Sequence, residues 1–225
     1  MSRIALVTGV SSGIGQAIAE TLLKNDWHVI GLSRTQVSNE LPNFVSYSVD
    51  LMDTQKLLNC LEQLPKIDAV IHAAGEMVAA PLGSLNLEES QTIWQLHVGV
   101  AEILANYFAD KLSEGGRIVI IGSRTSKGVA GRSQYVATKS ALFGMVRSWA
   151  AELAPKGITA NIIAPGATET PMLMNPNRKS SPPKLPPIGR FISPYEVAQY
   201  VNFIVSPHAG AITGQELVIC GGASL

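Results

Sequence analysis

Short apolar segments alternate with helical patterns along almost the whole chain, and this alternation limits the possible folds more than any other feature. The apolar segments lie at 3–9, 27–33, 44–50, 67–73, 117–123, 158–164 and 216–220. Helical patterns lie between them, near 14–25, 53–63, 87–112, 134–154 and 194–206. Several of the short segments are apolar nearly throughout, as expected of parallel strands covered on both faces. The sequence therefore predicts an α/β fold, a doubly wound parallel sheet of about seven strands with helices on both faces.

Two of the predicted helices have clear start signals. Asn86 followed by Glu89 has the form of a capping box, and Ser193-Pro194-Tyr195-Glu196 supplies a cap, a first-turn proline and an acid. The chain contains neither an internal repeat nor a linker that divides it. We therefore expect residues 1–225 to form a single domain.

Composition excludes several classes of protein. Hydrophobic residues make up 46% of the 225 residues, enough for a substantial core, and the formal net charge is zero. A nucleic-acid partner is not expected, since the sequence has no long basic run. The two cysteines form no disulfide framework or zinc pattern, and the histidines lack metal-type spacing, so we expect no catalytic metal (Cys60, Cys220; His28, His72, His97, His208).

The N-terminal sequence MSRIALVTG has an apolar run too short for a signal peptide or a membrane-spanning helix. Together with the absence of a disulfide framework, this predicts a cytoplasmic protein without a membrane partner.

One segment interrupts the alternation. Residues 171–187 carry six prolines, which predicts that they do not form a regular helix. Two interpretations stay open for the stretch from about 171 to 190, a disordered loop or a segment that covers a binding site.

A glycine cluster follows the first predicted strand and opens the first predicted helix. Residues 8–15 read TGVSSGIG, with Gly9, Gly13 and Gly15. Glycines allow a tight turn and the close approach of a pyrophosphate, to which a helix N-terminus offers N–H groups. A turn that merely needs positive φ would usually require only one glycine. We therefore predict a dinucleotide site that includes the loop residues between the glycines (Ser11, Ser12, Ile14).

Tyr135 and Lys139 stand four residues apart within a predicted helix. Their side chains therefore lie on the same helix face, where the positive charge of a lysine lowers the pKa of a tyrosine. Taken alone, this spacing also occurs by chance on solvated helix faces.

Taken together, TGVSSGIG, YVATK at 135–139 and NIIAPG at 161–166 resemble the short-chain dehydrogenase/reductase family, in the order in which that family carries its motifs. The strand ending at Ser123, the segment Thr170-Pro171-Met172 and TGQELVICGG at 213–222 fit the same pattern. The resemblance covers essentially the whole chain and implies a Rossmann-type fold.

The resemblance also implies roles for individual residues. Tyr135 would exchange a proton with the substrate oxygen while hydride moves to or from a nicotinamide. Lys139 would support Tyr135 and bind the nicotinamide ribose, and Ser123 would polarise the carbonyl. The alternative for Ser123 is an ordinary serine at a strand end. Further cofactor contacts are implied beside the nicotinamide and the adenine (Asp50, Leu51, Ala73, Ala74, Gly75, Pro165, Gly166, Thr168, Thr170).

The residues after the second strand indicate the cofactor. An acid at this position favours NAD, whereas an arginine accommodates the 2′-phosphate of NADP. Here the residues are Ser33 and Arg34. The sequence therefore favours NADP(H), although Arg34 as a solvated loop residue is the alternative.

Several positions depart from the family pattern. The family usually has NNAG after its fourth strand, where this chain has His72-Ala73-Ala74-Gly75, and Cys220 stands where DGG is more usual. Ser123 and Tyr135 are 12 residues apart, one fewer than expected. His97 aligns with a catalytic asparagine that supports a proton relay. It either takes over that relay or is a hydrogen-bonded core residue.

The preferred interpretation is an NADP(H)-preferring oxidoreductase that interconverts a carbonyl and a secondary alcohol. The alternative is a catalytically impaired nucleotide sensor or interaction protein of the same fold. An epimerase or dehydratase is less favoured, because related enzymes of that kind are longer. The segment at about 171–190, as a candidate cover, combines apolar and basic residues, so a hydrophobic ketone and an acyl thioester that carries a phosphate or carboxylate both stay open. The resemblance also implies a homodimer or homotetramer, with the helices near 87–112 and 134–154 as candidate interfaces.

Overall fold

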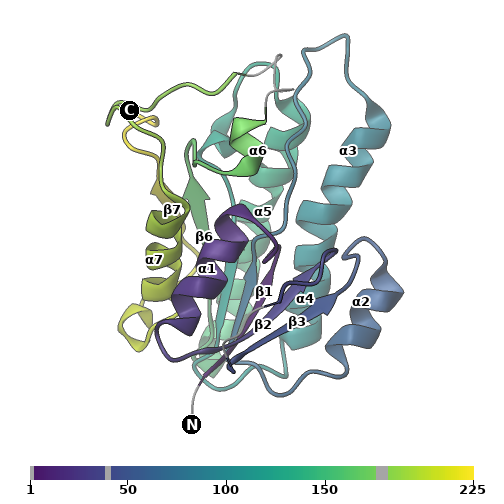
Figure 1. Ribbon diagram of the computed structural model, residues 1–225, viewed down its shortest axis with the longest axis vertical. Helices are drawn as coiled ribbons and strands as arrows, with labels where there is room; N and C mark the ends of the chain where they lie inside the picture. The colour runs from purple at the N-terminus through teal and green to yellow at the C-terminus, as the bar shows by residue number, and fades with distance from the viewer. Residues whose placement is uncertain (1–2, 39–41, 176–181) are drawn as a thin grey trace.

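The structure is a computed structural model that describes residues 3–38, 42–175 and 182–225. One parallel sheet of seven strands lies at its centre (Figure 1). Their order across the sheet is β3-β2-β1-β4-β5-β6-β7. The strands are β1 (Ile4–Thr8), β2 (His28–Ser33), β3 (Phe44–Ser48), β4 (Ala69–His72), β5 (Arg117–Ile121), β6 (Thr159–Pro165) and β7 (Glu216–Ile219). This confirms the predicted α/β fold. Because the strand order reverses between β1 and β4, their carboxyl ends open the crevice in which such sheets bind ligands.

The helices cover both faces of the sheet. They are α1 (Gly13–Leu23), α2 (Thr54–Leu61), α3 (Leu87–Trp94), α4 (Val100–Phe108), α5 (Ser133–Leu153), α6 (Pro171–Met174) and α7 (Pro194–Ile204). Figure 1 shows α1 and α7 side by side, where they pack against each other. None of the helices in the described ranges is long and apolar enough to cross a membrane.

Two apolar clusters, one on each face, explain why the central strands are apolar nearly throughout. Successive side chains of a strand point to opposite faces. Ala5 and Val7 of β1 join a buried cluster with α1 and α7, whereas Leu6 joins a second cluster with α2, α4 and α5. Ala5, Leu6 and Val7 are all fully buried, so these three consecutive positions favour apolar residues.

Both predicted helix starts are capped by the expected residue, and the one at Ser193 is a complete capping box. Ser193 and Glu196 form a complete capping box at the start of α7. At the start of α3 the Asn86 side chain accepts hydrogen bonds from the backbone N–H groups of Glu88 and Glu89. These caps fix the N-termini of the two helices.

Two predictions about helices need correction. The region 87–112 was expected as one helix, but α3 and α4 are separated by a π-helical turn, Gln95–Gly99, which contains His97. The proline-rich segment was expected to contain no regular helix, yet Pro171–Met174 form one short turn. It begins with a proline, which the first helical position tolerates, and the Thr170 side chain caps it. The two interpretations left open for residues 171–190, a disordered loop or a covering segment, fall partly on residues 176–181, which lie outside the described ranges.

Candidate active site

Two neighbouring cavities lie at the carboxyl ends of the strands. Their volumes are about 310 and 570 Å³. Both are lined by Ile14, Ala73, Gly75 and Glu76, and also by the cap and one residue of α6 (Thr170, Met172). The two cavities are therefore adjacent, and a ligand can extend from one into the other.

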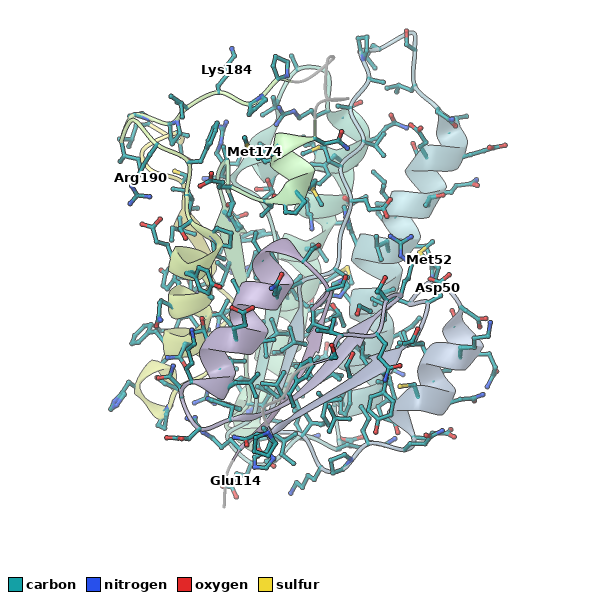
Figure 2. All side chains as sticks on the ribbon, in the orientation of Figure 1. Asp50, Met52, Glu114, Met174, Lys184 and Arg190 are labelled. Atoms are coloured by element: carbon teal, nitrogen blue, oxygen red, sulfur yellow. The ribbon has the colours of Figure 1, made fainter. Side chains whose placement is uncertain are left out.

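The first cavity is built by the glycine turn and the ends of β2, β3 and β4. Most of the predicted cofactor residues line it: Gly9, Ser11, Ser12, Gly13, Ile14, Gly15, Ser33, Arg34, Asp50, Leu51, Ala73, Ala74, Gly75 and Thr170. Asp50 and Met52, labelled in Figure 2, mark the exit of β3 beside this cavity. The fold thus brings together residues separated by up to 161 positions in the sequence.

The glycines of the turn are required by its geometry. Gly9 has a φ of +76°, and a Cβ atom there would lie 2.9 Å from the backbone of Ala74. A Cβ atom at Gly15 would collide with the carbonyl oxygen of Gly9. This close packing of the start of α1 against the end of β1 is the arrangement that accommodates a pyrophosphate at a helix N-terminus.

Arg34 lies at the cavity but is already paired. Its guanidinium donates to Oε1 of Glu76 at 3.3 Å, and both side chains are largely accessible to solvent. Sequence reasoning identified Arg34 but missed Glu76, which is 42 positions away and belongs to no motif.

The second cavity contains the predicted catalytic residues. Ser123, Tyr135, Lys139 and His97 all line it, and so do Pro165, Gly166, Thr168 and Thr170. Met172 and Leu173 of α6 and the stretch Pro182–Lys184 line it as well. Met174 and Lys184 lie at the end of the molecule beyond the carboxyl ends of the strands, as Figure 2 shows.

Tyr135 and Lys139 lie on one face of α5 and are nearly buried. The Nζ atom of Lys139 lies 5.7 Å from the centre of the Tyr135 ring and donates to the carbonyl oxygen of Ile121 at 2.9 Å. Burial lowers the pKa of Lys139 to about 7, since the charged form loses its hydration. Near neutrality Lys139 is therefore present both as the ammonium and as the neutral amine.

Ser123 follows β5 and is held by local contacts. Its hydroxyl accepts from the backbone N–H of Thr125 at 3.2 Å and lies 2.8 Å from the Thr125 hydroxyl. These bonds orient the side chain at the strand end while it still lines the cavity.

His97 is completely buried and both of its ring nitrogens are engaged. Nε2 lies 3.1 Å from the backbone nitrogen of Glu76, whose N–H donates to it. Nδ1 lies 2.8 Å from the hydroxyl of Thr138, which in turn donates to the carbonyl of Tyr135. These partners require the neutral tautomer with hydrogen on Nδ1. Burial and the nearby Lys139 lower the pKa of His97 well below its usual value.

His72 is a second buried histidine in this region. Its Nε2 is 3.0 Å from the carbonyl oxygen of Leu96, to which it donates, and its Nδ1 is 2.9 Å from the Thr8 hydroxyl. Thr8 also accepts from the backbone N–H groups of Ala73 and Ala74. Burial, reinforced by Lys139, lowers the pKa of His72 to about 3. His72 thereby links β4 and β1 to the π-helical turn.

Thr8 and Thr138 were missed by sequence reasoning. Thr138 had an available signal, because it stands three residues after Tyr135 and so shares its helix face. For Thr8 the sequence offers no comparable signal, because its hydroxyl bonds to His72 of the neighbouring strand, 64 positions away.

Comparison with known proteins places this geometry in context. A family model described as enoyl-(acyl carrier protein) reductase matches residues 9–224. The chain is 31% identical to the 3-oxoacyl-(acyl-carrier-protein) reductase FabG of Vibrio harveyi, over 98% of this chain and 96% of that protein. It is 34% identical to carbonyl reductase family member 4 of Danio rerio, over 100% of this chain and 99% of that protein.

Solved structures show the same fold. A blue fluorescent protein from a metagenomic library, solved in complex with NADPH, is 27% identical to this chain. It superimposes with a TM-score of 0.88 over 99% of this chain and 98% of that one.

Proposed function

This chain belongs to the short-chain dehydrogenase/reductase family and is an NAD(P)-dependent oxidoreductase, and we propose that it uses NADP(H) to interconvert a carbonyl and a secondary alcohol. The observation that carries this proposal is the shared wall of the two cavities. The glycine turn borders one of them, and Ser123, Tyr135 and Lys139 border the other. A dinucleotide that fills the first cavity can thus present its reactive end to the second.

Each polar group of the second cavity has a proposed role. When bound, the nicotinamide supplies or accepts the hydride. Tyr135 donates a proton to the carbonyl oxygen in reduction and takes it back in oxidation, so that atoms and charge balance. The Ser123 hydroxyl orients and polarises the carbonyl, and Lys139 binds the nicotinamide ribose and supports ionisation of Tyr135 when protonated.

Arg34 supports the proposed preference for NADP(H). It follows β2 at the cavity and provides a guanidinium for the 2′-phosphate, a contact worth about ten- to a hundredfold in affinity. One of the solved neighbours holds NADPH. Asp50 does not take the position of the ribose-binding acid, because it follows β3 rather than β2.

The charges of the second cavity favour an anionic substrate. Among the described residues that line it, the basic ones are Arg124, Arg132, Lys139 and Lys184, whereas the only acid is Glu76. Met172 and Leu173 provide apolar surface beside them. We therefore propose as the preferred class a 3-oxoacyl thioester whose thiol carrier bears phosphate groups, in line with the name of the Vibrio harveyi relative. A neutral hydrophobic ketone is the competing class.

A homo-oligomer is part of the same proposal. Trp94 on α3 and Phe143 on α5 expose 47% and 40% of their surface, on the two helical regions expected to form interfaces. Sedimentation of the protein, with Trp94→Ser and Phe143→Ser as variants, tests this. A monomeric wild type contradicts it.

The proposed activity is tested by following nicotinamide absorbance with NADPH and NADH. The substrates are 3-oxoacyl thioesters, neutral ketones and quinones, and the control is Tyr135→Phe, which removes only the phenolic hydroxyl. We expect turnover with NADPH and a thioester, and a loss of about 10²- to 10⁴-fold in the variant.

The other outcomes identify which part of the proposal fails. Faster turnover with NADH contradicts the role of Arg34, and turnover with neutral ketones alone contradicts the anionic class. Tight NADPH binding without turnover of any compound favours a nucleotide sensor.

A further inference from the structure

The ion pair between Arg34 and Glu76 crosses the cofactor cavity. Arg34 directly follows β2, and Glu76 lies four residues beyond the end of β4. Since β1 lies between these two strands, the pair spans the carboxyl end of β1, where Gly9 begins the glycine turn. Both side chains line the same cavity as the glycines.

The backbones on both sides of the pair are fixed, although the side chains are accessible. The carbonyl of Arg34 accepts from the Ser48 hydroxyl at 2.8 Å, and the N–H of Glu76 donates to the buried His97. The side chains of Arg34 and Glu76 expose 75% and 49% of their surface. A ligand can therefore reach the guanidinium and displace the carboxylate without moving the fold.

The charges of this cavity do not favour an additional phosphate. Among the described residues that line it, Arg34 is positive and Asp50 and Glu76 are negative. A phosphate monoester carries about −1.5 to −2 charges at neutral pH. It would have to replace Glu76 at the guanidinium and then remain close to that carboxylate.

We propose that Glu76 determines how strongly the protein distinguishes NADPH from NADH, because it holds Arg34 when no 2′-phosphate is present and competes with the phosphate for it. Glu76 is thus a specificity-determining residue that weakens the preference given by Arg34. This inference rests on the proposed function, since it requires a nicotinamide dinucleotide in the first cavity.

The test is Glu76→Gln, which removes the charge and keeps the size of the side chain. The readout is the ratio of kcat/KM for NADPH to kcat/KM for NADH, together with the Kd of each cofactor. An exposed ion pair is weak, so we expect this ratio to rise by about three- to tenfold, mainly through tighter NADPH binding. Glu152→Gln, the same change at an exposed position of α5, is the matched control and should leave the ratio unchanged.

A second background tests whether Glu76 acts through Arg34. In Arg34→Leu the additional Glu76→Gln change should raise the ratio less than it does alone, because the ion pair no longer exists and only the repulsion between carboxylate and phosphate is removed. An unchanged or lower ratio for Glu76→Gln alone overturns the proposal. An equal rise with and without Arg34 also overturns it, because Glu76 would then not act through Arg34.

The test of Glu76 can be interpreted whether or not the wild type prefers NADP(H). A wild type that prefers NADH disproves that preference, yet the change in ratio on Glu76→Gln still decides the role of Glu76.

Discussion

Lys139 is an ionisable residue in an environment that disfavours its charge. The residue is 6% exposed, and the hydrogen bond from Nζ to the Ile121 carbonyl provides no opposite charge. Burial therefore lowers its pKa to about 7. Placing the Lys139 charge in this buried environment thus lowers the stability of the fold, while the proposed chemistry requires it there. Such a trade-off is often found at active sites.

We predict that Lys139→Met stabilises the cofactor-free protein, and more so at low pH. Between about pH 7 and its usual pKa, Lys139 is protonated in the unfolded chain but neutral in the fold, so wild-type stability rises with pH. The cost of burying the charge is complete below about pH 7. We expect the advantage of the variant to shrink by about 2 kcal/mol between pH 7 and 9. Urea unfolding measures it, and parallel stability curves for the two proteins would contradict the prediction.

His97 was predicted either to relay protons or to be a hydrogen-bonded core residue. Both of its ring nitrogens are bonded, one to Thr138 and the other to the backbone of Glu76. Glu76 lines the cofactor cavity. The hydrogen bonds therefore favour a positioning role, in which His97 fixes the segment after β4 relative to α5.

We predict that His97→Asn raises the KM for the cofactor while the pH profile of kcat stays unchanged. The shorter amide cannot bridge both partners, and loss of one hydrogen bond costs about 1 kcal/mol, or about fivefold in affinity. Steady-state kinetics from pH 5 to 9 distinguish the two roles. A reduced kcat with a displaced pH profile and an unchanged KM would instead identify His97 as a relay.

The connection from β1 to α1 permits one prediction about an element. A methyl group at Gly15 would collide with the carbonyl of Gly9, which belongs to the backbone and cannot turn away. We therefore expect Gly15→Ala to shift the start of α1, to lower the melting temperature and to weaken NADPH binding at least tenfold.

Gly144→Ala is the matched control for Gly15→Ala, since a Cβ atom at Gly144 meets open space in the middle of α5. Isothermal titration and thermal unfolding measure both effects. Unchanged affinity in Gly15→Ala would show that the turn is not where the pyrophosphate binds.

Elements followed from the sequence wherever their signal is local. The strands are apolar because both faces are covered, and Ser193 and Glu196 are close enough in sequence to reveal a helix start. The π-helical turn at 95–99 could not be predicted in this way. It is stabilised by His72, which binds the Leu96 carbonyl, and by Thr138, which binds His97. These partners are 24 and 41 residues away in the sequence. The spacing of apolar residues along the helix therefore does not indicate the π-helical turn.

The same distinction applies to the candidate site. Tyr135, Lys139 and the glycines stand in short motifs whose spacing has a physical reason, and all of them line the two cavities. Glu76 and Thr8 contribute through contacts between separate strands. Such contacts depend on which strands are neighbours in the sheet and on how they are aligned. No short sequence motif gives this information.

For the whole molecule, the two buried histidines make stability sensitive to acid. His72 is 2% exposed and His97 is fully buried, and both are neutral in hydrogen-bonded networks that connect β1, β4, the π-helical turn and α5. Burial lowers the pKa of both histidines in the folded protein, so they stay neutral at mildly acidic pH. A histidine in the unfolded chain takes up a proton freely near its usual pKa.

We predict that the free energy of unfolding falls as the pH drops below about 6.5. From there down to about pH 3, the pKa of His72 in the fold, the unfolded chain binds a proton at this residue that the folded protein does not. At His72 this should cost about 2 kcal/mol between pH 6.5 and 5, and His97, whose pKa burial also lowers, adds to the loss in the same direction. Urea unfolding at fixed ionic strength measures it.

His72→Asn separates this effect from the titration of carboxylates. The variant loses the titrating ring, so its stability curve should be flatter than that of the wild type by about 2 kcal/mol over the same range. The exposed His28 at the start of β2 is the matched control, and His28→Asn should leave the slope unchanged. Equal slopes for all three proteins would mean that His72 takes up its proton in the fold, through a rearrangement of its bonds to Thr8 and Leu96.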